Sequence, residues 1–256
     1  MTFGVPRPDK IDYYAQVAEA GRDYKRQVLA ALDLRPGLTV LDVGCGPGTD
    51  LPAMAEAVGP SGAVLGVDTE PAMVEEAGRR VSGTPQISVR LGDAHALPLA
   101  ESSVDRARAD RMVQHVADPA AVFGELHRVL RPGGLACVAE PDWDSLVVDP
   151  GELPTNRAFN RFVCSTMVRN ATIGRSLPRL ALGAGFEVLD VSVAAPVFRD
   201  FEAADKILGL SRNTERAVRA GQLDRAVGDQ WLAVLAAGPF LASSMVFIGV
   251  FAKPAA

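Results

Sequence analysis

The chain has 256 residues, enough to bury a sizeable core, and an α/β sheet protein of this length often forms one domain. Its formal net charge of -5 lacks the basic excess that neutralises nucleic-acid phosphates, so we expect a small-molecule substrate and no nucleic-acid partner. No apolar run reaches the ~18 residues of a membrane span, and three widely spaced cysteines show no metal-ligand spacing, so we expect a cytoplasmic protein without membrane contact.

The first predicted element is a helical segment within residues 1–35, where 11–32 have helical spacing and no strand precedes them. A helix outside the βαβ alternation has to pack on the sheet rather than between two strands. We therefore predict that it forms an N-terminal lid.

Beyond this segment, apolar runs rich in β-branched residues alternate with amphipathic stretches, which is typical of βαβ units around a parallel sheet. Pro71 opens one predicted helix, and Asp118 caps another. We predict an α/β protein with a Rossmann-like, doubly wound sheet. The seven predicted strands are 39–43, 63–68, 87–91, 104–109, 135–140, 186–193 and 245–252.

Two stretches interrupt the alternation, 142–173 after the fifth predicted strand and 201–238 before the last. Ligands of open α/β sheets bind outside the carboxyl ends of the strands, so both insertions are placed to cover a substrate. The alternative is that they extend the core, and around Trp231 the two interpretations are equally favoured. We predict one domain, 1–256, with these insertions as a substrate cap.

A glycine-rich turn follows the first predicted strand. Its glycines are Gly44, Gly46 and Gly48, and 49–58 after them reads as a helix. Glycines let the backbone turn sharply and approach a ligand, while the first turn of a helix presents unpaired N–H groups. Such a turn suits a nucleoside with a polar tail, although many glycine-rich turns are only tight turns.

Asp68 supports the interpretation of the glycine turn as a nucleoside site, because it ends the second predicted strand, twenty residues beyond Gly48. A carboxylate there can accept hydrogen bonds from both ribose hydroxyls of a nucleotide. The alternative is a cap for the helix that follows Thr69. Dinucleotide enzymes require a third glycine where this chain has Thr49, so the motif differs from theirs.

With these motifs the chain resembles the class I S-adenosylmethionine-dependent methyltransferases, in particular those acting on quinones and natural products. The resemblance implies a mostly parallel seven-stranded sheet with helices on both faces and an antiparallel last strand. It also implies S-adenosylmethionine as cofactor and methyl transfer to an O, N or C atom of a small molecule. The matching segments are 40–50, 66–77, 89–105, 114–134 and 174–186.

The resemblance also assigns the cofactor contacts. The three glycines would face the methionine and ribose parts, and Met73 would pack against the adenine. Asp93 would accept from the adenine amino group, with a turn residue as its alternative. Arg111 would engage the methionine carboxylate or be solvated. The implied cofactor-binding residues are Tyr14 (with Tyr13 as a rival), Gly44, Gly46, Gly48, Asp68, Thr69, Met73, Asp93, Ala94 and Arg111.

The fourth predicted strand departs from the family pattern, since Arg106 and Arg108 lie on one face where aliphatic residues are usual. An unpaired buried charge is very costly. We therefore expect carboxylates from neighbouring elements to pair with these arginines, while their aliphatic stems cover the core.

For proton removal, similar natural-product enzymes use a histidine after strand four and an acid after strand five, which implies His115 and Glu140. His115 could instead brace the following helix, Glu140 could fix the inserted segment, and alignment alone could suffice. Asp110, Glu140 and Asp142 could supply oxygen ligands for Mg²⁺, but their spacing lacks the paired signature of metal-dependent relatives, so no metal is predicted.

Two other functions stay open. A methyltransferase-like protein could bind S-adenosylmethionine and catalyse a different reaction, such as a cyclisation, or it could bind the cofactor without catalysis. DNA amino-methylation is disfavoured, because Asp110 to Val113 replace the tetrad expected after strand four. The sequence indicates no oligomeric state.

Overall fold

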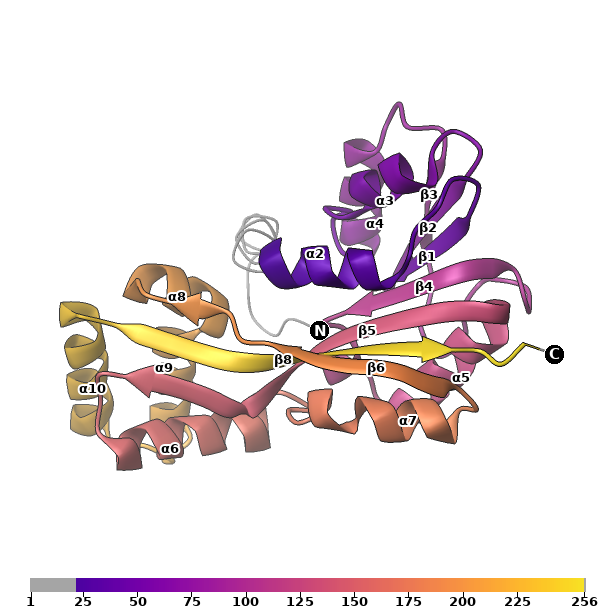
Figure 1. Ribbon diagram of the computed structural model, residues 1–256. Helices are drawn as coiled ribbons and strands as arrows, with labels where there is room; N and C mark the ends of the chain where they lie inside the picture. The colour runs from indigo at the N-terminus through magenta and orange to yellow at the C-terminus, as the bar shows by residue number, and fades with distance from the viewer. Residues whose placement is uncertain (1–21, 256) are drawn as a thin grey trace.

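The computed structural model describes residues 22–255, and the predicted fold is confirmed there (Figure 1). One sheet runs in the order β3-β2-β1-β4-β5-β8-β6, with β7 paired to β8. β8 is antiparallel to both of its long neighbours, β5 and β6. The strands are β1 Thr39–Val43, β2 Ala63–Asp68, β3 Ile87–Leu91, β4 Val104–Asp110, β5 Leu130–Asp149, β6 Glu187–Ala194, β7 Val197–Phe198 and β8 Leu241–Ala252.

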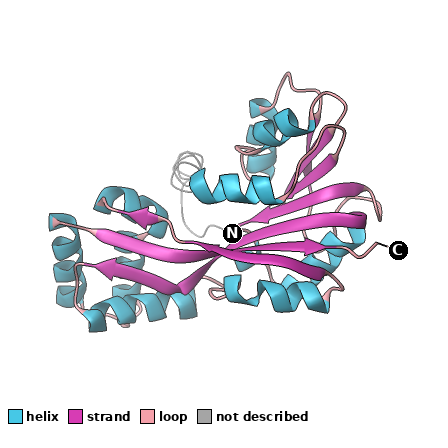
Figure 2. Cartoon of the chain, in the orientation of Figure 1, coloured by secondary structure: helices cyan, strands magenta, loops and turns pink. Residues whose placement is uncertain are grey.

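A helix separates most consecutive strands in the first half of the chain, although β4 follows β3 directly, and several helices lie between strands in the second half. Figure 2 shows the helices packed around the strands. They are α2 Arg22–Ala31, α3 Leu51–Val58, α4 Pro71–Arg80, η1 Val113–His115, α5 Pro119–Val129, α6 Leu153–Phe162, η2 Val163–Met167, η3 Gly174–Ser176, α7 Leu177–Gly183, α8 Phe201–Leu208, α9 Leu210–Arg219 and α10 Arg225–Ala237.

Local chemistry explains where several elements begin. Asp118 accepts hydrogen bonds from the amides of Ala120 at 2.9 Å and Ala121 at 3.1 Å, which satisfies donors at the start of α5. Pro71 occupies the first turn of α4, where its missing N–H costs nothing. Both predicted helix starts are therefore confirmed.

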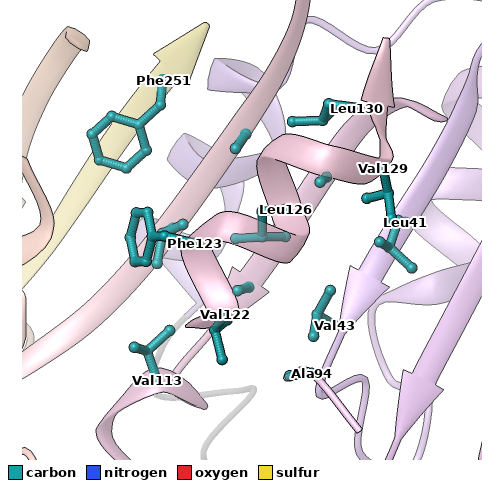
Figure 3. Packing of buried hydrophobic residues seen from close by; sticks show 14 of the residues in the cluster. Leu41, Val43, Ala94, Val113, Val122, Phe123, Leu126, Val129, Leu130 and Phe251 are labelled. Carbon is teal, nitrogen blue, oxygen red and sulfur yellow. The ribbon is translucent and has the colours of Figure 1, made fainter. Parts of the chain in front are cut away.

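The main core lies between the sheet and helices α5 and α7. Phe123 and Leu126 of α5 are fully buried there, and Phe123 meets Phe251 of β8 edge to face, with ring centroids 5.9 Å apart. Figure 3 shows Phe123 and Leu126 along one helix, with Phe251 on the side of Phe123 and Leu41 of β1 on the opposite side, near Val129. On the opposite face, α2 covers β5 and β8, and α3 covers β1 and β2.

β5 and β8 are longer than predicted and leave the main sheet together (Figure 1). Past the end of β4 they stay paired as far as Asp149 opposite Leu241, and the short β7 joins the edge of β8. A second core lies on this extension, where it is covered by helices α6, α8, α9 and α10. In this core the ring centroids of Trp231 and Phe159 are 5.0 Å apart. We call these helices, with β7 and the β5–β8 extension, the outer lobe.

From the packing of the main core we predict a large loss of stability when one of its buried side chains is truncated. Phe123→Ala removes a fully buried ring and its contact with Phe251, so the free energy of unfolding should fall by about 3–5 kcal/mol. Urea denaturation measures this change. The matched control is Leu182→Ala on α7, an exposed leucine, which should change stability by less than about 0.5 kcal/mol. Equal effects of the two substitutions would contradict this packing.

Candidate functional site

The glycine turn lies between β1 and α3 in the left-handed backbone conformation that side chains disfavour. The φ angles are 72° at Gly44, 54° at Gly46 and 74° at Gly48. A Cβ on Gly44 would lie 2.8 Å from the Cβ of Met112, and one on Gly48 would lie 2.9 Å from the Cβ of Ala77. The turn is therefore packed directly against the loop after β4 and against α4.

Asp68 braces this turn. Its carboxylate accepts hydrogen bonds from the amides of Gly46 and Glu70, each at 2.9 Å. Burial raises its pKa above the ordinary value. The two carboxylate oxygens together have about four acceptor sites, so the group keeps capacity for a ligand. Asp68 thus both braces the glycine turn and contacts Glu70 at the start of α4. This arrangement fits the ribose end of a nucleoside cofactor.

The residues implied for the adenine lie around the ends of β2 and β3. Met73 and Ala94 are buried, whereas Thr69 and Asp93 are exposed. Asp93 accepts from the amide of His95 at 2.9 Å, and its Oδ1 also lies 2.6 Å from the Nδ1 of that histidine. These contacts lower the pKa of Asp93. His95 was not predicted from the sequence, although its position two residues after Asp93 was the available signal.

The predicted carboxylate partners are confirmed for Arg108, whereas Arg106 has one distant carboxylate, Asp33 at 3.8 Å, and pairs more closely with a backbone carbonyl. Arg108 is buried and contacts Asp42 at 3.1 Å, Asp50 at 2.8 Å and Asp110 at 2.5 Å. Arg106 donates to the carbonyl of Leu32 at 2.7 Å. Burial raises the pKa of Asp42 to about 6, although Arg108 opposes this shift.

Helix α2 is tied to the same cluster. Lys25 contacts Asp50 at 2.5 Å, and the hydroxyl of Tyr24 donates to Asp110 at 3.2 Å. The cluster joins α2, the end of β1 and the end of β4 beside the glycine turn. The arginines were identifiable from the sequence, but the partners that pair with them were not, since these come from three separated elements.

The two candidate bases lie around η1. Glu140 is fully buried, its Oε1 accepts from the amide of Val113, and its Oε2 has no hydrogen-bond partner within residues 22–255. Burial raises the pKa of Glu140 to about 8. Burial lowers the pKa of His115 to about 4. Glu140 therefore holds the turn after β4 in place.

A pocket is lined by residues of α2, the middle of β5, β8 and the outer lobe, and by Arg111 directly after β4. Arg111 is one of its lining residues, with φ at 57°, and its amide donates to the carbonyl of Ala139 at 2.8 Å. The volume of the pocket is about 50 Å³. We call it the junction pocket, and its lining residues are Tyr24, Arg111, Pro141, Trp143, Pro196, Phe198, Ile207, Leu208, Ser244 and Val246.

The structure brings the glycine turn after β1, Asp68 at the end of β2 and Met73 of α4 to one edge of the sheet. Arg111 lies at the same edge, directly after β4, which is the neighbour of β1. Tyr14 and Tyr13 lie outside the described residues. Within residues 22–255, no group of three His, Cys, Asp or Glu side chains is arranged to hold a metal ion. In that same part of the chain no helix is both long and apolar enough to cross a membrane.

The raised pKa of Glu140 predicts a pH-dependent stability difference. The folded protein keeps this proton up to about pH 8, whereas the unfolded chain loses it near the ordinary value of 4.5. The resulting stabilisation is complete below pH 4.5 and is lost as the pH rises through 8. Glu140→Gln retains an acceptor for Val113 and does not titrate, so its stability relative to the wild type should improve between pH 5 and pH 9.

Urea denaturation at pH 5, 7 and 9 measures this difference. The matched control is Glu56→Gln, since Glu56 is exposed on α3 and hydrated in both states. A difference between wild type and Glu140→Gln that does not change with pH would contradict the raised pKa.

Comparison with known proteins shows the family of the chain. A family model described as a methyltransferase domain matches residues 34–181. The chain is 53% identical over 245 residues to a 37.1 kDa protein in a transposon of Streptomyces fradiae, covering 95% of this chain and 71% of that protein.

A second relative is the demethylmenaquinone methyltransferase of Symbiobacterium thermophilum, with 35% identity over 131 residues. That match covers 49% of this chain and 52% of the relative, so it spans about half of each. Among solved structures, the [4+2]-cyclase SpnF superposes with a TM-score of 0.57 at 21% identity, over 91% of this chain and 82% of that chain, which shows the shared fold. The chain therefore belongs to the S-adenosylmethionine-dependent methyltransferases, and S-adenosylmethionine is its cofactor.

Proposed function

We propose that the protein transfers a methyl group from S-adenosylmethionine to an O, N or C atom of a small molecule, such as a quinone-like or secondary-metabolite acceptor. The observation that carries this proposal is the junction pocket, which adjoins the glycine turn through Arg111 and Met112. A mostly apolar pocket with few polar groups is typical of a small-molecule site. The relative that methylates demethylmenaquinone supports a small acceptor.

We assign the cofactor contacts by the resemblance and the geometry. Gly44, Gly46 and Gly48 would hold the methionine and ribose parts, and Asp68 the ribose hydroxyls. Thr69, Met73, Asp93 and Ala94 would surround the adenine. The cofactor supplies a methyl group already activated by its positive sulfur, so the chain has mainly to orient the acceptor and exclude water. Residues 142–173 and 201–238 contribute outer-lobe walls of the junction pocket, which supports their proposed role as a substrate cap.

Glu140 and His115 remain the candidate bases, but their surroundings favour a bracing role. Glu140 engages the turn after β4 and has no exposed surface. His115, with its pKa lowered to about 4, is a weak proton acceptor. We therefore propose that alignment in the junction pocket contributes more to the rate than either side chain.

We also propose that the protein acts in the cytoplasm. All three of its cysteines are free thiols, which suits a reducing compartment. Its acidic net charge supports a small-molecule acceptor over a nucleic acid.

A second candidate function is a reaction other than methyl transfer, such as a cyclisation, which the shared fold with SpnF supports. Methyl transfer predicts that S-adenosylhomocysteine forms in equal amount to a methylated product when the protein meets S-adenosylmethionine and a panel of phenols and quinols. Mass spectrometry measures both products. Conversion of an acceptor without S-adenosylhomocysteine would instead establish the second candidate.

We predict that the Asp68→Ala variant folds but binds the cofactor more weakly than the wild type does. The substitution removes a charged acceptor, and a hydrogen bond to a charged group contributes about 1.5–3 kcal/mol. The affinity for S-adenosylhomocysteine, measured by calorimetry, should fall about tenfold to a hundredfold. The matched control is Asp229→Ala on the exposed face of α10, which should bind as the wild type does. Wild-type affinity in Asp68→Ala would remove Asp68 from the cofactor site.

A further inference from the structure

The backbone turn after β3 carries Asp93 and is anchored on two sides. The amide of Gly92 donates to the carbonyl of Asp68 at the end of β2, at 3.0 Å. The amide of Leu97 donates to the carboxylate of Glu125 on α5, at 2.7 Å. The position of the Asp93 backbone is therefore fixed by the end of β2 and by α5.

The side chain of Asp93 is held by His95. The backbone amide of His95 donates to Oδ1 of Asp93 at 2.9 Å, and Nδ1 of the imidazole lies 2.6 Å from the same oxygen. The first contact is the usual turn of an aspartate with the amide two residues on, whereas the second depends on the histidine side chain. Both contacts use Oδ1, and the Asp93 side chain is 61% exposed, so Oδ2 is available to a ligand.

The other ring nitrogen of His95 decides which nitrogen carries the proton. Nε2 accepts from the backbone amide of Asp118, at the start of α5, at 3.2 Å. An amide N–H only donates, so Nε2 has no proton in this contact, and a neutral imidazole then carries its proton on Nδ1. Nδ1–H therefore donates to Asp93, and the ring connects α5 to this carboxylate.

The exposed oxygen of Asp93 acts as a hydrogen-bond acceptor. Hydrogen bonds from the amide and the ring of His95 lower the pKa of Asp93, so its carboxylate is ionised at neutral pH. An ionised carboxylate has no proton to donate, and its complement is a donor such as the amino group of adenine. Because the ring of His95 keeps Oδ1 engaged, the carboxylate does not turn, and Oδ2 is presented in one orientation.

We propose that His95 is a positioning residue that sets the base selectivity of the cofactor site, by holding Asp93 so that Oδ2 accepts from the adenine amino group. His95 acts through Asp93 and does not itself contact the cofactor. An acceptor that is oriented before binding loses less conformational freedom when the ligand arrives. This inference rests on the proposed assignment of Asp93 to the adenine and adds the residue that orients that carboxylate.

The test compares S-adenosylhomocysteine with its deamino analogue, in which a hydrogen replaces the amino group of the purine. The analogue keeps the ring nitrogens and lacks only the donor that Asp93 would bind. Wild-type protein should prefer S-adenosylhomocysteine by about tenfold or more, because the analogue forgoes a hydrogen bond to a charged group. Calorimetry measures both affinities. Equal affinities in the wild type would overturn the proposal.

Variants of His95 then locate the effect. His95→Ala removes the ring and should reduce the preference to about threefold or less, since the carboxylate can then turn. His95→Asn retains a side-chain N–H that can donate to Asp93 in place of Nδ1, so it should restore most of the preference. A wild-type preference in His95→Ala would overturn the proposal.

The matched control is Asp118→Ala, which removes the side-chain cap of α5 but keeps the backbone amide that donates to His95. This variant should melt at a lower temperature and keep the wild-type preference. A loss of preference equal to that in His95→Ala would assign the effect to the stability of α5 and overturn the proposal.

Two further measurements separate this inference from the proposals on which it rests. Asp93→Ala should abolish the preference, and a wild-type preference there would remove Asp93 from the adenine. Loss of the preference in Asp93→Ala but not in His95→Ala would overturn the role of His95 alone. Nitrogen chemical shifts at pH 8 should place the ring proton of His95 on Nδ1, and a proton on Nε2 would contradict the proposal. Failure to detect methyl transfer would leave all these binding measurements in force.

Discussion

The antiparallel pairing of β5 with β8 is the constraint on which the rest of the structure depends. The ladder begins at Leu135 opposite Ala252 in the main sheet and ends at Asp149 opposite Leu241 in the outer lobe. It contributes Phe251 to the main core and Ala242 to the second one, so both cores are built on the same two strands. Because these two strands run without a break from the main sheet into the outer lobe, they determine where the outer lobe lies relative to the sheet.

The ladder also creates the space for a ligand. Its register shifts between Asp142 and Val147, at the level where the junction pocket lies. β4 ends opposite Ala139, so Pro141 lies where β5 has no partner on that side and a missing N–H is tolerated. The β5–β8 ladder is therefore irregular at the level of the pocket that Trp143 and Ser244 line.

The buried cluster around Arg108 shows how charges can be placed beside an apolar core. Removing a guanidinium group from water is costly, and three carboxylates offset that cost, while Lys25 balances part of their excess negative charge. The same groups hold α2 against the ends of β1 and β4. Because the glycine turn begins where β1 ends, the cluster fixes the distance between α2 and the cofactor edge of the sheet. Its geometry therefore affects the site without the need for contact with a ligand.

Burial likewise changes what Glu140 does. A carboxylate after strand five reads from the sequence as a candidate base, but the fold places it against the amide of Val113 and away from solvent. Its raised pKa reports that environment, in which the charged form loses its hydration. A shifted pKa is expected at catalytic groups and also at structural ones, and here the hydrogen-bond partner favours the structural role.

The sequence by itself determined the features that depend on neighbouring residues. The bounds of β1, β2 and β3 were predicted to the residue, as were the starts set by Asp118 and Pro71, because apolar period, caps and glycine turns act within a few residues. It also determined that Arg106 and Arg108 need carboxylate partners, since that follows from the cost of burying charge. Only the tertiary structure decided which carboxylates these are, how far β5 and β8 extend, the presence of β7, and the pocket around Arg111. Each of these depends on pairing between residues far apart in the chain, for which a single sequence carries no periodic signal.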